Sequence, residues 1–277
     1  MNDLIKIVLL SNGSQLGFNW IYNREFLKKY SKDNNMLMTK PINKHYEENK
    51  PSYNVYEGFE KGGNSLQGQM IIWLYNDVNN NKLYNEVNYK QLLLRHFNPG
   101  GIYKGYVESY GHKLILKELN KKFKTNNDIV MDDDQLVGFV PYVVYKALGR
   151  KSEDALKLTK VLTNNKEYDI LFEILDNINK ENIKEVIDAT SLSFKDKILN
   201  AIKYSDDSFI KDVHELSCSI DVAFPVIFYL YNKHNNLKDA LNENVILGGA
   251  SSDRAIILAL LYYPAELDKE WEKYLNI

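Results

Sequence analysis

The chain has 277 residues, 44% of them hydrophobic, which is long and apolar enough to bury a sizeable core and argues against global disorder. Its formal charge of −2 at pH 7 gives no long-range attraction for nucleic acid or anionic lipid. The single cysteine, Cys218, excludes an intrachain disulfide and fits a reducing compartment.

The first apolar run, Leu4 to Leu10, contains Lys6 and is too short to cross a membrane. It also lacks the small-residue cleavage pattern of a signal peptide. We therefore expect a cytoplasmic protein that has neither a membrane partner nor a nucleic-acid partner.

A long loop is predicted for residues 31–68, because Asn, Lys, Pro and Gly cluster there. Four aromatic residues are spread through this segment and give it something to pack with, which argues against pure disorder. They are Tyr46, Tyr53, Tyr56 and Phe59.

The segment "GIYKGYVESYGHK", residues 101–113, spaces tyrosines with glycines around the acidic residue Glu108. Tyrosines near a carboxylate suit an aromatic nucleotide or a sugar, because one ring stacks while another hydrogen-bonds. The same residues suit an interface between a helix and a loop, so both interpretations stay open.

No metal site is predicted from the histidines, which are scattered and lack a His-x-x-x-His spacing. Only "MDDDQ", with Asp132, Asp133 and Asp134, could offer several hard oxygen ligands to Mg²⁺ or Ca²⁺. A solvated turn that caps a helix is the more common use of such residues.

The last two-thirds of the chain have helical periodicity, with Ser152 and Ser193 as expected N-caps and an amphipathic helix around 170–178. Residues 223–231 and 255–263 are apolar on nearly every side, which predicts two fully packed central helices. With no internal repeat, strand pattern or linker, the sequence predicts one all-α domain over 1–277.

Between these helices lies "GGASSDR", residues 248–254. Ser251 or Ser252 can cap the following helix, and Asp253 can complement its positive end. The same helix start would also attract anionic oxygens, because glycine permits close approach to unpaired N–H groups. These residues alone leave both roles open.

In chain order, these segments resemble the ADP-ribosylglycohydrolase superfamily of the dinitrogenase-reductase-activating type, over nearly the whole chain. The most similar branch of this superfamily has a "HWIYD" signature. Five segments carry the resemblance, and the last two of them match most specifically. The segments are "NWIYN" (19–23), "GGNSLQGQMIIWLY" (62–75), "YKGYVESYG" (103–111), "CSIDVAFPVIFY" (218–229) and "VILGGASSDRAIILALLYY" (245–263).

The resemblance implies an all-α fold that recognises ADP-ribose in a cleft lined by loops and cleaves its C1″ glycosidic bond. The partner would be an ADP-ribose-containing small molecule or an ADP-ribosylated protein. Well-known members hold two Mg²⁺ ions between two aspartate-rich motifs, whereas here 65–69 has no carboxylate and 250–253 has one. We therefore expect no metal and no cofactor, and interpret 248–254 as a ligand cradle that resembles a lost metal site.

Hydrolysis without metal needs an acid for the leaving group and a carboxylate facing the ribosyl cation or water. Glu108 is the first choice for that carboxylate, followed by Asp133 and Asp253. The residues expected to bind the ligand are Asn19, Trp20, Tyr22, Gln67, Gln69, Tyr103, Tyr106, Asp132, Asp221, Gly248, Gly249, Ser251, Ser252 and Arg254.

Three functions compete at this point: a metal-independent ADP-ribosyl hydrolase, a non-catalytic protein that binds ADP-ribose-like ligands, and a structural protein on a retired enzyme fold. Likeness of fold does not decide among them, because function depends on the site.

Overall fold

A computed structural model describes residues 1–81, 83–131 and 135–275, and every regular element in these ranges is a helix. Strand-like pairing among them is limited to two isolated bridges, Ile21–Ser52 and Gln135–Ser219. The prediction of an all-α fold is thereby confirmed. The helices are α1 (Asp3–Gln15), α2 (Arg24–Tyr30), α3 (Asn43–Glu48), α4 (Leu66–Asn80), α5 (Glu86–Phe97), α6 (Ser109–Phe123), α7 (Phe139–Ala147), α8 (Ser152–Thr159), α9 (Glu167–Asn177), α10 (Ile183–Asp188), α11 (Lys195–Ala201), α12 (Ile220–Lys233), α13 (Leu237–Leu247) and α14 (Ser251–Tyr262), and the 3₁₀ turns are Leu16–Phe18, Leu136–Gly138, Asp207–Phe209, Val213–Leu216 and Lys269–Tyr274.

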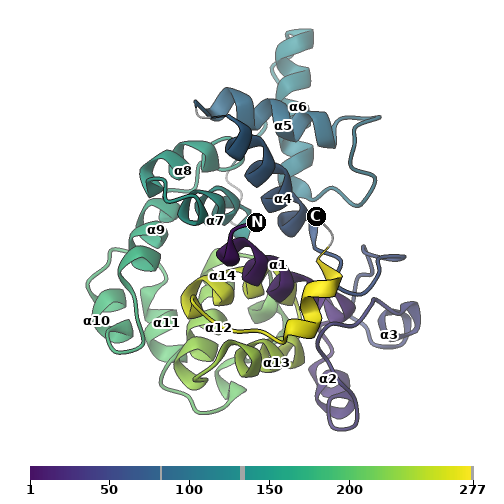
Figure 1. The fold of residues 1–277 in the computed structure, drawn as a ribbon, viewed down its shortest axis with the longest axis vertical. Coiled ribbons are helices and arrows are strands. Elements are labelled where there is room, and N and C mark those ends of the chain that lie inside the picture. Colours follow the sequence, from purple (N-terminus) through teal and green to yellow (C-terminus); the bar gives the residue numbers. More distant parts are fainter. Residues whose placement is uncertain (82, 132–134, 276–277) are drawn as a thin grey trace.

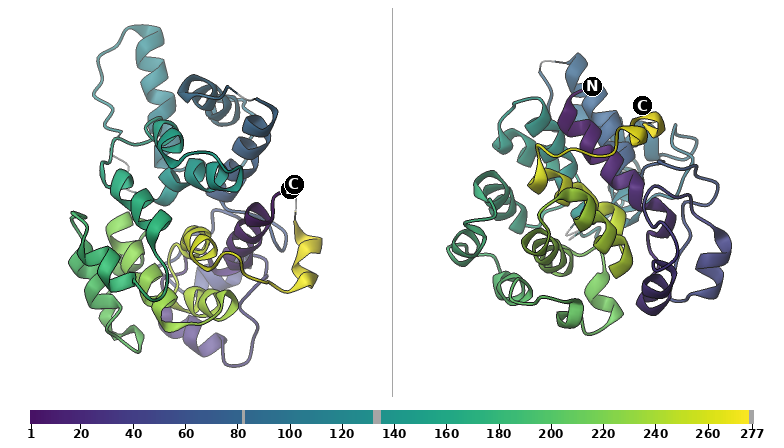
Figure 2. Two further views of the ribbon diagram at one scale, coloured as in Figure 1. Left: turned by 60° about the vertical axis from the view of Figure 1, so that its left-hand side comes forward. Right: turned by 60° about the horizontal axis from the view of Figure 1, so that its bottom comes forward.

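Helix α14 lies at the centre of the molecule, and α1 runs beside it with the most extensive contact of any helix pair (Figures 1 and 2). Helices α12, α13 and α4 also pack on α14. Every residue from Ser251 to Leu260 is buried, as is every residue from Ala223 to Tyr231 of α12. The two segments that are apolar all round are thus the central helices, as predicted.

Helix α1 buries side chains of two different kinds. Its first half contributes apolar residues such as Ile5 and Leu9 to the core. Its second half is polar, yet Asn12 and Gln15 are both 0% exposed. Buried polar groups are stable only when they are hydrogen-bonded. The second half of α1 therefore requires polar partners inside the fold.

Residues 31–68 are irregular apart from the short helix α3, and α4 begins at Leu66. Tyr46 and Tyr56 are each only 2% exposed, and the Tyr46 hydroxyl donates to the Asn19 carbonyl at 2.9 Å. Tyr53, in contrast, is 60% exposed. Two of the aromatic residues thus anchor the loop against the core, as their distribution suggested.

Two predicted helix caps are each wrong by one residue. Ser152 is the first residue of α8 and follows the cap Lys151, while α11 begins at Lys195 after the cap Phe194. Neither cap residue makes a side-chain hydrogen bond to its helix. The Ser193 N–H instead donates to Glu167 of α9 at 3.3 Å, so tertiary contact decides this helix start.

No helix in the described part of the chain combines the length and the apolar character needed to cross a bilayer.

The burial of α14 leads to a stability prediction. Leu258 is 0% exposed, so we expect Leu258→Ala to lower the free energy of unfolding by about 2–5 kcal/mol, through lost burial and a new cavity. Leu83 is 88% exposed, so Leu83→Ala should change it by less than about 0.5 kcal/mol. Urea denaturation measures both, and equal losses would contradict the placement of α14.

Candidate functional site

The polar half of α1 meets the first turns of α4 and α14, and we call the meeting point of these three helix ends the polar junction (Asn12, Asn19, Ser65, Ser252 and Asp253). The Asn12 amide donates to Ser65 Oγ at 2.8 Å and to the Ser252 carbonyl at 3.0 Å. Its Oδ1 accepts from the Ser65 N–H at 2.9 Å. One side chain therefore fixes two helix starts.

The first turn of α4 is packed tightly against Asn12. The Ser65 hydroxyl donates to Asp253 Oδ1 at 3.1 Å and also accepts from the Gly68 N–H at 3.5 Å. A Cβ atom on Gly68 would lie 2.5 Å from Asn12 Oδ1. Position 68 therefore needs glycine for close approach, and the junction has no room for a larger residue there.

The cap of α14 comes from a distant part of the chain. Asn19 Oδ1 accepts from the Ser252 N–H at 3.0 Å, while Ala250, which makes no side-chain bond, occupies the cap position. The expected capping by Ser251 or Ser252 is therefore wrong. Both serine hydroxyls, like Asn19 Nδ2, are buried without a hydrogen-bond partner in the described ranges.

Gly248 and Gly249 have φ values of +86° and +69°, where glycine is favoured. A Cβ atom would lie 2.5 Å from the Ile21 carbonyl oxygen at Gly248 and 2.1 Å from the Leu216 carbonyl oxygen at Gly249. The two glycines therefore allow the close approach of neighbouring backbone.

The N–H groups that were expected to receive a phosphate already have acceptors. The Gly249 N–H donates to the Ile21 carbonyl at 2.8 Å, and that of Ala250 donates to the Leu216 carbonyl at 3.3 Å. The neighbouring donors, Gly248, Ser251 and Ser252, are bonded as well. This geometry does not support the expected backbone cradle for phosphate at 248–252.

Arg254 is fully buried and holds the end of α13. Its guanidinium donates to Asn244 Oδ1 at 2.8 Å and to the Gly248 carbonyl at 2.5 Å. Burial lowers the pKa of Arg254 to about 10, and the nearby Tyr22 and Asp253 oppose this effect. A cation at the C-terminal end of a helix is favourable. These bonds give Arg254 a structural role, but its Nη1 is buried without a hydrogen-bond partner in the described ranges, so the expected ligand contact stays a prediction.

Trp20 has a φ of +66°, which is uncommon for a residue with a bulky side chain. Its N–H donates to the Gly249 carbonyl at 2.8 Å, and its carbonyl accepts from the Tyr53 N–H at 3.0 Å. The indole N–H is buried without a hydrogen-bond partner among the described residues. Backbone strain that the surroundings enforce in this way is concentrated at functional sites.

The Trp20 ring lies between a buried and an exposed tyrosine. Its centroid is 6.4 Å from that of Tyr56, which is buried, and 6.0 Å from that of Tyr106, which is 45% exposed and meets it edge-on. We call these three rings the aromatic mouth (Trp20, Tyr56 and Tyr106); they extend from an exposed to a buried position.

Glu108 and Asp253 are 2% and 1% exposed, at the starts of α6 and α14. Burial raises the pKa values of Tyr56 and Tyr110, and the charges of both carboxylates raise them further. Glu108 and Asp253 therefore act on the same two phenols. Burial also raises the pKa of Asp253 itself, against the hydrogen bond from Ser65 and the charge of Arg254.

The remaining predicted residues lie in several places. Tyr103 meets Trp73 edge-on at 5.5 Å, and burial together with Glu108 raises its pKa to about 12. Tyr22 meets Tyr53 edge-on at 6.3 Å. In the first turn of α4, Gln67 is buried and its Nε2 lacks a hydrogen-bond partner in the described ranges, whereas Gln69 is half-buried.

Asp221 is not joined to the polar junction by any interaction between described residues. It forms an ion pair with Lys197 of α11 at 2.5 Å and lines a separate cavity of about 190 Å³. The other acidic predictions, Asp132 and Asp133, lie outside the described residues. Among those described, no three His, Cys, Asp or Glu side chains gather so that they could hold a metal ion.

The sequence interpretation missed Asn12 and Ser65, which organise the junction. A signal was present, because Ser11, Asn12, Ser14 and Gln15 interrupt the apolar character of a helix that begins with "LIKIVLL". Such a helix either faces water or buries polar groups with partners. Only the tertiary structure identifies those partners.

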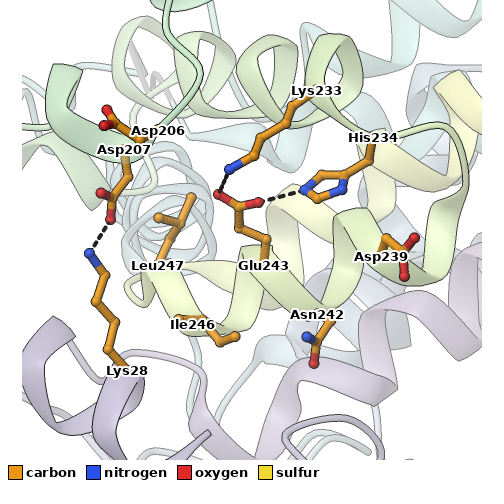
Figure 3. A pocket seen from close by; sticks show the side chains of 10 residues that line it. All are labelled: Lys28, Asp206, Asp207, Lys233, His234, Asp239, Asn242, Glu243, Ile246 and Leu247. Atoms are coloured by element: carbon orange, nitrogen blue, oxygen red, sulfur yellow. Dashed lines mark hydrogen bonds and ion pairs between the residues drawn. The ribbon is translucent and has the colours of Figure 1, made fainter. Parts of the chain in front are cut away.

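A second cavity, of about 450 Å³, lies beside α13 and contains none of the predicted site residues (Figure 3). Glu243 lines it and accepts from Tyr229, Lys233 and His234 at 2.7, 2.8 and 2.5 Å. Burial opposes ionisation of Glu243, but these hydrogen bonds outweigh it and lower its pKa to about 2. The polar groups of this cavity thus largely satisfy one another.

No protein-family model matches the chain, and no curated protein sequence matches it. The resemblance to ADP-ribosylglycohydrolases therefore rests on the quoted motifs.

The buried Asp253 carboxyl leads to a pH prediction. In the folded protein, the pKa of Asp253 lies above the ordinary value of 3.8. The stability that the protonated carboxyl contributes is therefore fully present below pH 3.8 and is lost as pH rises through the folded pKa. Asp253→Asn keeps an acceptor for Ser65 but does not titrate. We therefore expect the variant to lack this loss of stability, which in wild type amounts to up to about 1.4 kcal/mol per pH unit. Urea denaturation from pH 4 to pH 8 measures it.

Asp221 provides the matched control, because its pKa is shifted in the other direction. Burial opposes ionisation, but hydrogen bonds from Lys197 and Ser219 outweigh it and lower the pKa. The stability that Asp221 contributes is therefore lost as pH falls through its folded pKa, so Asp221→Asn should be most harmful near neutral pH. Identical pH profiles for both variants would contradict the assignment of Asp253.

Proposed function

We propose that the protein hydrolyses an ADP-ribosyl glycosidic bond, with the ligand entering at the aromatic mouth. The observation that carries this proposal is the position of Glu108 and Asp253, two buried carboxylates that act on the same pair of tyrosines, one of which contacts Trp20. Glycosidic hydrolysis requires an acid and a carboxylate on either side of the reacting bond, and we propose these two residues for those roles. The motif resemblance supports the same substrate class.

In the proposed reaction, the bond between ribose C1″ and the leaving nitrogen or oxygen breaks as the oxygen of water bonds to C1″. Glu108 takes the proton from that water or stabilises the positive charge that develops on the ribose. A second proton goes to the leaving group, and Asp253 is suited to supply it because burial keeps its carboxyl protonated to higher pH.

The aromatic mouth supplies the expected binding energy. Tyr106 is exposed enough to meet a ligand, while Trp20 is fixed by backbone hydrogen bonds. A base or ribose that stacks on these rings would gain contact area without ordering a flexible loop. The indole N–H of Trp20, which is buried without a hydrogen-bond partner in the described ranges, would then find an acceptor on the ligand.

The donor set at the polar junction fits poorly with a pair of Mg²⁺ ions. Asp253 is its one carboxylate and already accepts from Ser65, while Asn12 is bonded to Ser65 and Ser252. Mg²⁺ gives up water reluctantly and is bound through carboxylates or phosphates. We therefore propose a reaction that does not use a di-magnesium centre.

The role of Glu108 leads to a test. Glu108→Gln keeps the shape and removes the charge, so it should lower turnover of an ADP-ribosylated substrate about 10²–10⁴-fold. Affinity for ADP-ribose should stay within a few-fold of wild type. Product formation and calorimetric affinity are measured side by side, and undiminished turnover would remove Glu108 from the mechanism.

Substitution of the aromatic mouth distinguishes an enzyme from a binding protein. Trp20→Ala and Tyr106→Ala should weaken ligand affinity more than Glu108→Gln does, because they remove stacking area. If wild type binds ADP-ribose but forms no product from any ADP-ribosylated substrate, the non-catalytic binding protein is the better description. Absence of both binding and turnover would reject this proposal altogether.

Removal of metal gives a separate prediction. Turnover should be the same in EDTA as in added Mg²⁺, because the proposed chemistry uses protein carboxylates only. A loss of activity in EDTA that Mg²⁺ restores would contradict the metal-independent mechanism while leaving the substrate class in place.

A further inference from the structure

The outer face of α6 carries an apolar stripe formed by Leu116, Leu119 and Phe123. Their exposed fractions are 48%, 41% and 64%. At 3.6 residues per turn, the three side chains fall on one narrow face, opposite the side that buries Tyr110 and Leu114. Neighbouring apolar side chains exposed on one face indicate an interaction surface more often than isolated ones do.

The same helix is strongly basic. Residues 109–124 contain five lysines and one glutamate, a net charge of +4. The whole chain carries −2, so the rest of it carries −6. The overall charge excludes a general attraction to anions but conceals this local positive region.

Most of this charge is not neutralised within the described chain. Lys121 pairs with Glu118 at 2.9 Å, and Lys90 contacts the same carboxylate at 3.3 Å. Lys117, Lys122 and Lys124 form no ion pair with any described residue. The Lys122 ammonium lies 5.5 Å from the centroid of the Phe123 ring, so charge and apolar surface are adjacent.

Helix α6 lies at one extremity of the molecule, far from α2 and α3 (Figures 1 and 2). Its end projects beyond the neighbouring helices (Figure 1). A flat surface could therefore meet this end without contact with α10 or α13, which lie toward the other end.

In contrast to the expectation from the overall charge, we propose that α6 docks on an anionic membrane surface. Leu116, Leu119 and Phe123 would enter the boundary between headgroups and acyl chains, and Lys122 and Lys124, which adjoin Phe123 at the end of the helix, would face lipid phosphates. Lysine suits this position because its stem covers apolar surface while its ammonium stays at the headgroups. A second copy of the chain is a poor occupant, because two α6 stripes would bring like charges together.

The contact would be peripheral and reversible. Each apolar side chain and each lysine contributes only weakly to binding. A single lysine near an anionic surface changes partitioning by about fivefold. Salt should weaken the contact, because exposed charges are screened within a Debye length of about 10 Å at 0.1 M. The surface does not depend on the proposed hydrolase activity.

The test uses the full chain in flotation with vesicles of phosphatidylcholine alone or mixed with phosphatidylserine. We expect binding to the mixed vesicles only, with release at high salt. Phe123→Ser should lower partitioning about tenfold, through lost apolar burial, and Lys122→Glu with Lys124→Glu at least as much. Ile42→Ser and Lys32→Glu, both exposed and near α2 and α3, should leave partitioning unchanged.

A direct reporter complements flotation. Phe123→Trp keeps the apolar character, so its emission should shift to shorter wavelength on mixed vesicles relative to wild type. Circular dichroism verifies that each variant keeps its helical content. Failure to bind mixed vesicles, or equal binding by Phe123→Ser, would overturn the proposal. Binding to a poly-glutamate peptide without binding to vesicles would overturn it too and identify an acidic protein segment as the occupant.

Discussion

The structure depends on the satisfaction of one buried amide. Asn12 is 0% exposed and bonds to Ser65 and to the Ser252 carbonyl, so α1, α4 and α14 cannot shift without leaving polar groups unpaired in the core. An unsatisfied buried polar group costs about 1–3 kcal/mol, which is a large share of a domain's net stability. Apolar packing gathers these helices, but the hydrogen bonds of Asn12 determine their register.

Close contact between helix ends also shapes the interior of the candidate site. Glycine at position 68 permits the close approach of α4 to Asn12, and glycine at position 249 permits the close approach of the Leu216 backbone. Once these segments are in contact, the hydrogen bond to the Gly249 carbonyl holds Trp20 in its strained conformation. A scaffold of helix starts that is packed this tightly fixes its side chains more accurately than a mobile loop could.

The sequence predicted the two central helices and the docked loop, but it misplaced two helix caps and missed the hydrogen bonds that join distant parts of the chain. The burial of α12 and α14 follows from residues that are apolar on all sides, and the aromatic residues of 31–68 indicated a docked loop. The cap of α14 could not be assigned, because Asn19 is more than 230 positions away from Ser252. The hydrogen bonds of Arg254 to Asn244 and Gly248 could not be predicted either, because a linear motif does not show which groups the folded chain brings together.

Electrostatics suggests how two carboxylates in one site can divide the work. A buried carboxyl favours its neutral form unless hydrogen bonds or an opposite charge stabilise the ionised one. Burial already raises the pKa of Asp253, and Ser65 and Arg254 only partly offset this. Asp253 is therefore the carboxyl that favours its neutral form, which suits the role of acid that we propose for it. The proposed reaction uses protein carboxylates as acid and base, so it does not depend on the metal-binding aspartates of the family that the sequence resembles.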